Sequence, residues 1–376
     1  MAVRPPLGPD ELARLPARRG VFLLLGAGGE PILLATAASV RARVAFRLGP
    51  AEGQAGRRAD LRGVTAAVMW KLADSHFEAE WQFLELARAI YPDTYRELLA
   101  LRPPWFVRLV EGQRLPTFRR VRGVGGRGRY FGPFPHARAA GRFIELLQDV
   151  FGLCRNEHLL ERAGRGCVYA QMGRCPAPCR GGPAAEGYRG LVERACRCAE
   201  GDRESARQWL VEQMQRFSAA RQYELAGQCK ARLERLAELD GEDFAYVASA
   251  GRFRFVLFQP GPSRRAVKVF LADRGAMAPA GVLDYPPDAA ALRALLRRMA
   301  DFCRSGRSWG PEEQEGVALL CRYLFASPRR RGVAVRYDPD LTPEALARQL
   351  EQGAEVLRLR PARGKGRSGG SGSPAK

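Results

Sequence analysis

Histidine and lysine are scarce in this chain of 376 residues, which contains only three histidines and five lysines. The histidines, His76, His136 and His158, lack the close spacing of a histidine-based metal site. Long apolar runs are missing too: no stretch of about 18 apolar residues occurs, so we expect no membrane-spanning helix. The N-terminus also lacks the apolar core of a secretory signal peptide, which predicts a cytoplasmic protein.

These absences make the nine cysteines informative. Disulfides are rare in a reducing compartment, so the cysteines need another reason, and metal binding is the leading one. Four cysteines follow the spacing C-x12-C-x7-C-x3-C: Cys154, Cys167, Cys175 and Cys179. Proline and glycine around the last pair predict a rigid loop that directs several thiolates at one point. Four thiolates are the ligands of a zinc site or a [4Fe–4S] cluster.

A net charge of +21 at pH 7 predicts a polyanionic partner. The candidate phosphate contacts are arginines of a predicted helix and of a glycine-rich loop: Arg41, Arg43, Arg47, Arg127 and Arg129. For the helix, the alternative is a solvated face that binds nothing. For the loop, the neighbouring aromatic residues Tyr130, Phe131 and Phe134 are better interpreted as core than as a stacking surface.

Hydrophobic periodicity predicts a mixture of helices and strands. Residues 17–47 predict a β-hairpin followed by a helix, and residues 105–121 predict two further strands. Helices are predicted over residues 77–100, 138–151, 186–200 and 203–240, the last bent near Ser218 into a helical hairpin. From residue 244 onward, strands come first, then helices near 288–304 and 311–326, a strand, and a helix from Pro343. The basic Gly/Ser-rich end of the chain is expected to be disordered.

Three sequence blocks, at residues 129–154, 166–179 and 214–236, resemble the UvrC family of the ABC excinuclease. RYFGPFPHARAAGRFIELLQDVFGLC, at 129–154, resembles the segment before its first cluster cysteine, and GCVYAQMGRCPAPC, at 166–179, resembles its CLxYxxGxCxxPC block. MQRFSAARQYELAGQCKARLERL, at 214–236, resembles its UVR helical hairpin, with Tyr223, Glu224 and Ala226 at signature positions. The resemblance covers roughly residues 15–240. We find no match to the family's C-terminal RNase H-like endonuclease or helix–hairpin–helix modules.

The resemblance implies an α+β, multidomain protein. The expected units are a degenerate GIY-YIG-like α/β domain at 1–100, a cysteine-cluster domain at 101–200 and a UVR-like hairpin at 203–240. An uncharacterised α/β module at 244–355 and a disordered basic tail at 356–376 follow. The resemblance also implies that the four cysteines hold a [4Fe–4S] cluster, with zinc as the alternative.

The hairpin implies a protein partner, because the family's hairpin pairs with a similar one on a UVR-containing repair helicase subunit (UvrB-like). The residues expected to contact it are Phe217, Tyr223, Leu225 and Leu233. The alternative is that this apolar stripe docks on the chain's own C-terminal region. The second implied partner is DNA, and no membrane is implied.

The nuclease chemistry of the GIY-YIG family is expected to be lost. That chemistry needs motif tyrosines, an arginine and a metal-binding glutamate. In this sequence Leu33 stands at the second motif tyrosine and Phe83 at the glutamate, so Arg43 is the only retained position. In a shifted alignment, Glu80 or Glu85 would be the metal ligand.

Three functions are therefore compatible with the sequence. The first is a DNA-binding protein of nucleotide excision repair that resembles the N-terminal half of UvrC and does not cut DNA itself. The second is an active GIY-YIG-type endonuclease. The third is an RNA-binding or regulatory protein that uses the same scaffold.

Overall fold

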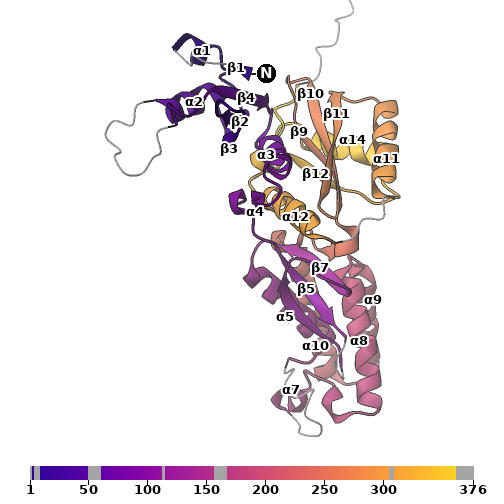
Figure 1. The fold of residues 1–376 in the computed structure, drawn as a ribbon. Helices are drawn as coiled ribbons and strands as arrows, with labels where there is room; N and C mark the ends of the chain where they lie inside the picture. Colours follow the sequence, from indigo (N-terminus) through magenta and orange to yellow (C-terminus); the bar gives the residue numbers. More distant parts are fainter. Residues whose placement is uncertain are drawn as a thin grey trace, which may run out of the picture.

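The computed structural model describes residues 2–3, 9–49, 61–111, 115–155, 167–304 and 309–360. The strands within these ranges form three four-stranded sheets, and all of their pairings are antiparallel. Figure 1 shows the three sheets in separate parts of the molecule, each with its own helices. This mixture confirms the predicted α+β class. The disordered tail predicted from residue 356 starts too early, because Leu357 and Leu359 are buried in the core of the C-terminal unit. Residues 361–376 of this tail lie outside the described part of the chain.

The N-terminal unit has a sheet of order β1-β4-β2-β3. Its elements are β1 (Ala2–Val3), α1 (Pro9–Ala13), β2 (Gly20–Leu25), β3 (Pro31–Ala37), α2 (Val40–Leu48), β4 (Ala67–Leu72), α3 (His76–Ile90) and α4 (Tyr95–Leu98). The hairpin predicted at 17–47 is confirmed as β2 and β3, followed by α2. Because strand side chains alternate, Phe22 and Leu24 pack on α2, whereas Val21 and Leu34 pack on α3.

The middle unit combines a sheet of order β6-β5-β7-β8 with four long helices. Its elements are β5 (Trp105–Val110), β6 (Thr117–Arg122), β7 (Arg129–Phe134), α5 (Ala137–Phe151), α7 (Val168–Gln171), α8 (Pro183–Ala199), α9 (Arg203–Ala219), α10 (Tyr223–Ala237) and β8 (Ala248–Ser249). Short 3-10 helices span Pro178–Arg180, Glu238–Asp240, Glu242–Phe244 and Ala250–Arg252. Side chains of β5, β7, α5, α8, α9 and α10 share one hydrophobic cluster, so the expected cysteine domain and hairpin have a common core.

The predicted helical hairpin is present as α9 and α10. Its turn contains Arg221 at φ +57, a left-handed conformation that ends the first helix. The base of the hairpin packs into the middle unit through Leu210 and Leu236, which are almost completely buried. The hairpin therefore docks on α5 and α8 of the middle unit, and not on the C-terminal region that the sequence left as an alternative.

The C-terminal unit follows the predicted order of strands and helices. Its elements are β9 (Arg254–Pro260), β10 (Ala266–Asp273), β11 (Ala276–Asp284), α11 (Ala289–Cys303), α12 (Pro311–Leu324), α13 (Pro328–Arg331), β12 (Val333–Arg336) and α14 (Pro343–Gln352). The sheet order is β11-β10-β9-β12. One sheet face packs on α11 and α14, and the other packs on α12.

Helix α3 joins the N-terminal and C-terminal units. In Figure 1 it lies between the N-terminal sheet and the C-terminal unit. The ring of Phe77 makes edge contacts with Phe270 on β10 and Tyr323 on α12, at centroid distances of 5.2 and 5.3 Å. One face of α3 therefore completes the core of a unit that begins more than a hundred residues later.

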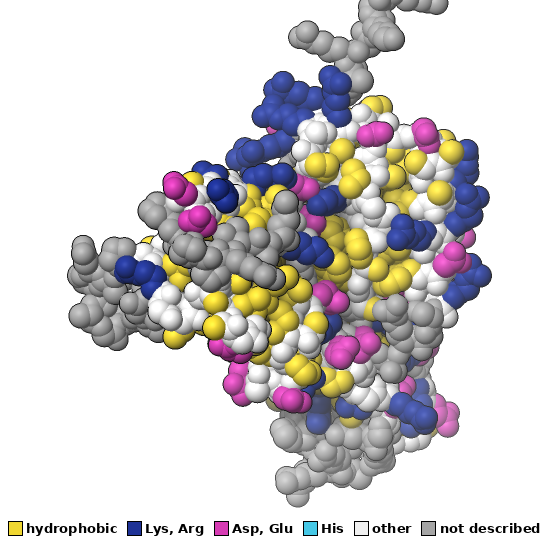
Figure 2. All heavy atoms as spheres, turned by 45° about the horizontal axis from the view of Figure 1, so that its top comes forward, with side chains coloured by type: hydrophobic (Ala, Val, Ile, Leu, Met, Phe, Trp, Pro, Cys, Tyr) yellow, Lys and Arg dark blue, Asp and Glu magenta, His cyan; other side chains and the backbone are white. Residues whose placement is uncertain are grey.

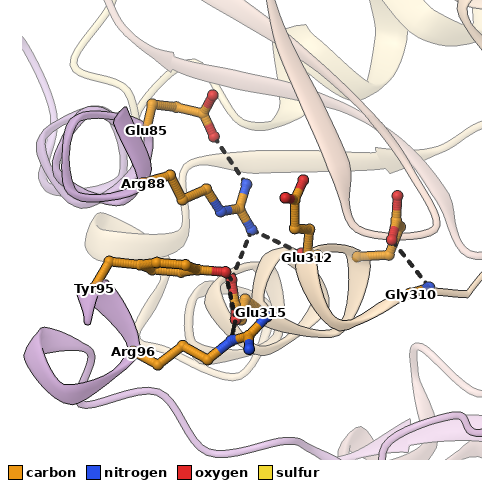
Figure 3. Close-up of polar contacts among 8 residues, drawn as sticks. Glu85, Arg88, Tyr95, Arg96, Gly310, Glu312 and Glu315 are labelled. Carbon is orange, nitrogen blue, oxygen red and sulfur yellow. Dashed lines mark hydrogen bonds and ion pairs between the residues drawn. The ribbon is translucent and has the colours of Figure 1, made fainter. Parts of the chain in front are cut away.

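A carboxylate on α12 adds hydrogen bonds to this interface. Glu315 accepts hydrogen bonds from Arg88 Nη2 at 3.0 Å, Tyr95 Oη at 3.0 Å and Arg96 Nε at 2.8 Å (Figure 3). All three donors come from α3 or α4. Since Glu315 is largely buried, these contacts fix the position of the N-terminal unit on α12.

Among the described helices, none has the length and apolar character needed to cross a membrane.

Candidate functional site

The four predicted ligand cysteines lie in the segment that connects α5 to α8. In Figure 1 helix α7, in the described part of this segment, is at the end of the middle unit farthest from the N-terminal sheet. Gly152 ends α5 at φ +65, and the chain turns directly into Cys154. The Cys154 backbone is held there by Gln148, which donates to its carbonyl, and by Tyr188, which accepts from its N–H.

Three of these cysteines are buried in one hydrophobic cluster. Cys154 and Cys175 are each 7% exposed, and Cys179, in the 3-10 helix after α7, is 3% exposed. A hydrogen bond with the Cys154 side chain, with another from the Ala177 backbone, outweighs burial and lowers the pKa of Cys175 to about 7. Thiols that ionise readily are suited to binding metals.

The cysteine set has the donor chemistry of a metal centre, but its described side chains are not gathered around one point. All four donors are thiols, and the Cys154 and Cys175 side chains are in contact. Cys167 is less buried and lies just before α7. Within the described ranges, no three His, Cys, Asp or Glu side chains are close enough to share one metal ion.

The other cysteines of the middle unit have no such arrangement. Cys196 and Cys198 are buried on α8, and burial raises the pKa of each thiol to about 12. Cys229 is also buried, on α10. In these buried positions the three cysteines pack as small apolar residues.

The four expected partner-binding residues separate into two pairs. Tyr223 is 69% exposed and Leu225 is 38% exposed, both in the first turn of α10. Phe217 and Leu233 are only partly exposed, and Leu233 packs against the core of the middle unit. Only the tip of the hairpin, Tyr223 and Leu225, therefore presents an open apolar surface.

A groove connects the hairpin with the cysteine segment. It has a volume of about 410 Å³ and lies between α5, α10 and the loop after α7. Met172 and Arg174 line it from the cysteine loop, and Gln228 and Arg232 line it from α10. A change in the cysteine loop would therefore alter a groove that the middle and C-terminal half of α10 also line.

The expected nuclease positions are not assembled into a site. Leu33 packs in the cluster on the α2 face of the N-terminal sheet, whereas Phe83 packs in the cluster on the α3 face. Of the alternative ligands, Glu80 pairs with Arg322 at 3.1 Å and with Arg330 at 4.0 Å. Glu85 is half exposed and pairs with Arg88 (Figure 3).

The three arginines of α2 that are predicted to bind phosphate are not all equally accessible to solvent. Arg41 and Arg43 are exposed, and Arg47 is half-buried. Arg41 Nε donates to the Leu15 carbonyl at 2.6 Å, and the Arg43 guanidinium lies 6.0 Å from the ring centroid of Phe46. Figure 2 shows further basic side chains along the top and right edge of the molecule, so positive charge is not confined to α2.

Of the two loop arginines, one is exposed and the other is paired. Arg127 is exposed, but Arg129 forms ion pairs with Glu193 at 2.6 Å and Glu200 at 3.3 Å on α8. Burial favours a lower pKa for Arg129, yet these carboxylates raise the pKa above its ordinary value. We therefore remove Arg129 from the phosphate-binding set and assign it a structural role. The seven-residue spacing of the two glutamates was the sequence signal of a shared helix face.

The predicted core role of the loop aromatics is confirmed. Tyr130, Phe131 and Phe134 are at most 4% exposed.

Comparison with known proteins gives a consistent result. The family model described as "UvrC/Cho excinuclease, middle domain" matches residues 105–198 of this chain. UvrABC system protein C of Moorella thermoacetica is 30% identical over 338 residues, which cover 79% of this chain and 54% of that protein. The protein of the same name from Sphingopyxis alaskensis is 31% identical over 364 residues, covering 91% of this chain and 51% of that protein. No solved structure matched.

Two facts follow from these alignments. An alignment covering 91% of the chain cannot fit within residues 15–240, so the similarity extends into the C-terminal unit. The chain spans about half the length of the curated relatives that it matches.

Proposed function

Because this chain is a UvrC-like protein, we propose that it is a DNA-binding protein of nucleotide excision repair. In this proposal it binds DNA through its basic surface and a UVR-containing, UvrB-like subunit through the tip of its helical hairpin. The N-terminal unit binds DNA but does not hydrolyse its phosphodiester bonds.

The exposed tip of the hairpin carries this proposal. Tyr223 and Leu225 place apolar surface in solvent at the first turn of α10, while the base of the same hairpin is buried. An exposed apolar pair on a rigid two-helix unit is suited to binding a second helical hairpin. The resulting four helices together bury the apolar side chains that two helices leave exposed to solvent.

The absence of hydrolysis is supported by the side chains at the nuclease positions. Leu33 has no hydroxyl and Phe83 has no carboxylate, and they lie on opposite faces of the sheet. The nearby carboxylate of Glu80 is neutralised by two arginines of the C-terminal unit. Neither of these two motif positions therefore supplies a hydroxyl or a ligand for a divalent cation.

We further propose that Cys154, Cys167, Cys175 and Cys179 hold a [4Fe–4S] cluster, with zinc as the alternative metal. Such a centre would stabilise a short, irregular segment, because metal binding contributes to folding. Its support is the all-thiol donor set, the burial of three members and the contact between Cys154 and Cys175.

The test uses the full chain and a purified UVR-containing helicase subunit. The Tyr223→Ser, Leu225→Ser double variant should weaken the complex at least tenfold, roughly as for loss of an interface anchor, and leave DNA binding unchanged. Val282→Ser, which removes another half-exposed apolar side chain on β11, is the matched control. Unchanged affinity in the double variant would contradict the assigned role of the tip. Incision of a lesion-bearing duplex with Mg²⁺ that is lost in Arg43→Ala would contradict the non-cutting assignment.

A further inference from the structure

A second cleft lies where the middle and C-terminal units meet. It has a volume of about 400 Å³ and is bounded by the linker at residues 100–104, the ends of β5 and β6, the start of α5, and α12. In Figure 1, α12 lies directly beside the end of the middle sheet that forms this cleft. We call it the junction cleft, and none of the residues assigned a role above in DNA or partner binding line it.

The junction cleft is rich in basic side chains. Arg102, Arg122, His136 and Arg322 line it, and no described lining residue is Asp or Glu. Arg322 is anchored by Glu80 at 3.1 Å and by the Ala100 carbonyl. Arg102 and Arg122 are exposed. A recess whose polar groups are donors suits an anion, and arginine suits phosphate in particular.

Histidine and helix geometry add to this donor set. His136 caps α5, because its Nδ1 accepts the Ala139 N–H at 3.0 Å. In the neutral ring the proton is therefore on Nε2, which makes this atom a donor. The 15-residue helix α5 also begins here, so the positive end of its dipole is close to the cleft.

Aromatic side chains form the remaining walls. Trp105 and Phe325 both line the cleft, and both are partly exposed. The Arg122 guanidinium carbon lies over the Trp105 ring, 4.5 Å from the ring centroid, because the two residues are paired across β5 and β6. A guanidinium placed over a ring still has N–H groups available for an acceptor such as phosphate. Phosphate-binding arginines beside aromatic surface are typical of sites that take unpaired nucleotides.

We propose that the junction cleft binds one unpaired nucleotide of a DNA strand. Arg102, Arg122 and His136 Nε2 contact its phosphate, and the aromatic walls contact its base. A recess of this volume accepts a single nucleotide, whereas the phosphates of an intact duplex would meet only its rim. The inference deepens the proposed DNA binding and rests on it.

The experiment measures fluorescence anisotropy of the full chain with a labelled single-stranded oligothymidylate and with a duplex of equal length. Arg122→Ala should weaken single-strand binding about five- to tenfold, within the range for loss of one stacked, phosphate-bound base. The slope of log affinity against log salt should fall by about 0.7, the value for one phosphate contact on a single strand. Duplex binding should change less.

Two further variants keep the test decisive. Arg297→Ala removes the same charge from the exposed face of α11 and should behave as the wild type. Arg102→Ala changes an exposed side chain of the linker, so it tests the cleft if Arg122→Ala lowers the melting temperature. Tryptophan quenching on strand binding should also diminish in Trp105→Phe.

The outcomes separate the two proposals. If the wild type binds neither DNA, the proposed function fails. If it binds DNA and both cleft variants match Arg297→Ala, the cleft assignment is overturned and the proposed function stands. If free deoxythymidine monophosphate binds as tightly as the strand, the site takes a free nucleotide and the assignment to a DNA strand is overturned.

Discussion

Lys268 on β10 and Glu78 on α3 form a 2.6 Å ion pair across the interface of the N-terminal and C-terminal units, although they are 190 positions apart in the sequence. Lys268 Nζ also lies 2.7 Å from Asp74 Oδ2. The carboxylate side chains of Glu78 and Asp74 are 7% and 11% exposed, so this lysine neutralises two poorly solvated charges.

Replacing Lys268 with Met should therefore destabilise the protein by about 2–3 kcal/mol. This is somewhat below the usual effect of breaking a fully buried pair, because the lysine side chain is 22% exposed. Urea unfolding followed by circular dichroism measures the change. Lys230→Met, at an exposed position of α10, is the control and should change the stability little.

The contribution of Lys268 should also depend on pH in a defined direction. Burial favours a lower pKa, but hydrogen bonds and charge attraction from Asp74 and Glu78 raise the pKa above its ordinary value of 10.5. A raised pKa means that the stabilisation is complete below pH 10.5 and is lost as the pH rises through the folded-state value. The stability difference between wild type and Lys268→Met should thus be constant from neutral pH to about pH 10 and shrink above it. A difference that vanishes at neutral pH would contradict this.

Glu315→Ala should loosen the N-terminal unit from α12. The substitution leaves Arg88, Tyr95 and Arg96 without their shared acceptor, at a cost of about 1–3 kcal/mol for a largely buried charged hydrogen-bond partner. Hydrogen exchange should increase in α3 and α4 and remain unchanged in α9 and α10. Tyr95→Phe, which removes only one donor, should show a smaller effect. Equal hydrogen exchange in the wild type and Glu315→Ala would contradict this prediction. It would show that the aromatic contacts of α3 are enough to hold the N-terminal unit on α12.

Cys175→Ser should abolish metal binding and its absorbance. An iron–sulfur centre predicts brown protein with iron and sulfide and a shoulder at roughly 400 nm, whereas zinc predicts colourless metal-loaded protein. Metal analysis of anaerobically purified protein measures both. Cys196→Ala is the matched control, because it changes a buried cysteine of the same core. Metal content that is equal in Cys175→Ser and Cys196→Ala would contradict the ligand assignment.

Substitution of glycine by alanine should have opposite effects on stability at two positions, Gly316 and Gly190. A Cβ on Gly316 of α12 would lie 1.8 Å from the Gly275 carbonyl oxygen, so Gly316→Ala should push the β10–β11 turn away and destabilise the protein by about 1–3 kcal/mol. A Cβ on Gly190, inside α8, would meet no atom within 4 Å. Gly190→Ala should therefore stabilise by about 0.5–1 kcal/mol through helix propensity. Thermal unfolding of both variants would show melting temperatures that move in opposite directions.

Much of the secondary structure followed from local pattern. The strands and helices of the C-terminal unit were predicted in order from their period-two and period-3.6 apolar spacing, and α9 and α10 from an uninterrupted helical pattern with a polar bend. The core role of Phe131 and Phe134 followed from the same reasoning. These features depend on residues close together in the chain, which a single sequence contains.

The residues of the sites were predicted less completely. Arg129 looked like a phosphate contact because nothing near it in sequence shows that Glu193 and Glu200 lie beside it. The hairpin stripe likewise looked continuous, but docking on α5 and α8 covers Leu233 and leaves Tyr223 and Leu225 exposed. The junction cleft could not be foreseen, because its walls come from the linker, the middle sheet and α12.

The sequence by itself determined the elements, their order, the four-cysteine spacing and the UvrC-like character of the chain. Only the tertiary structure decided which charges are paired, which end of the hairpin is open and where arginines gather around an aromatic recess. The physical reason is that helix and strand formation depend on neighbours along the chain, whereas ion pairing and burial depend on neighbours in space. Glu78 and Lys268 become neighbours only when α3 packs on the C-terminal sheet.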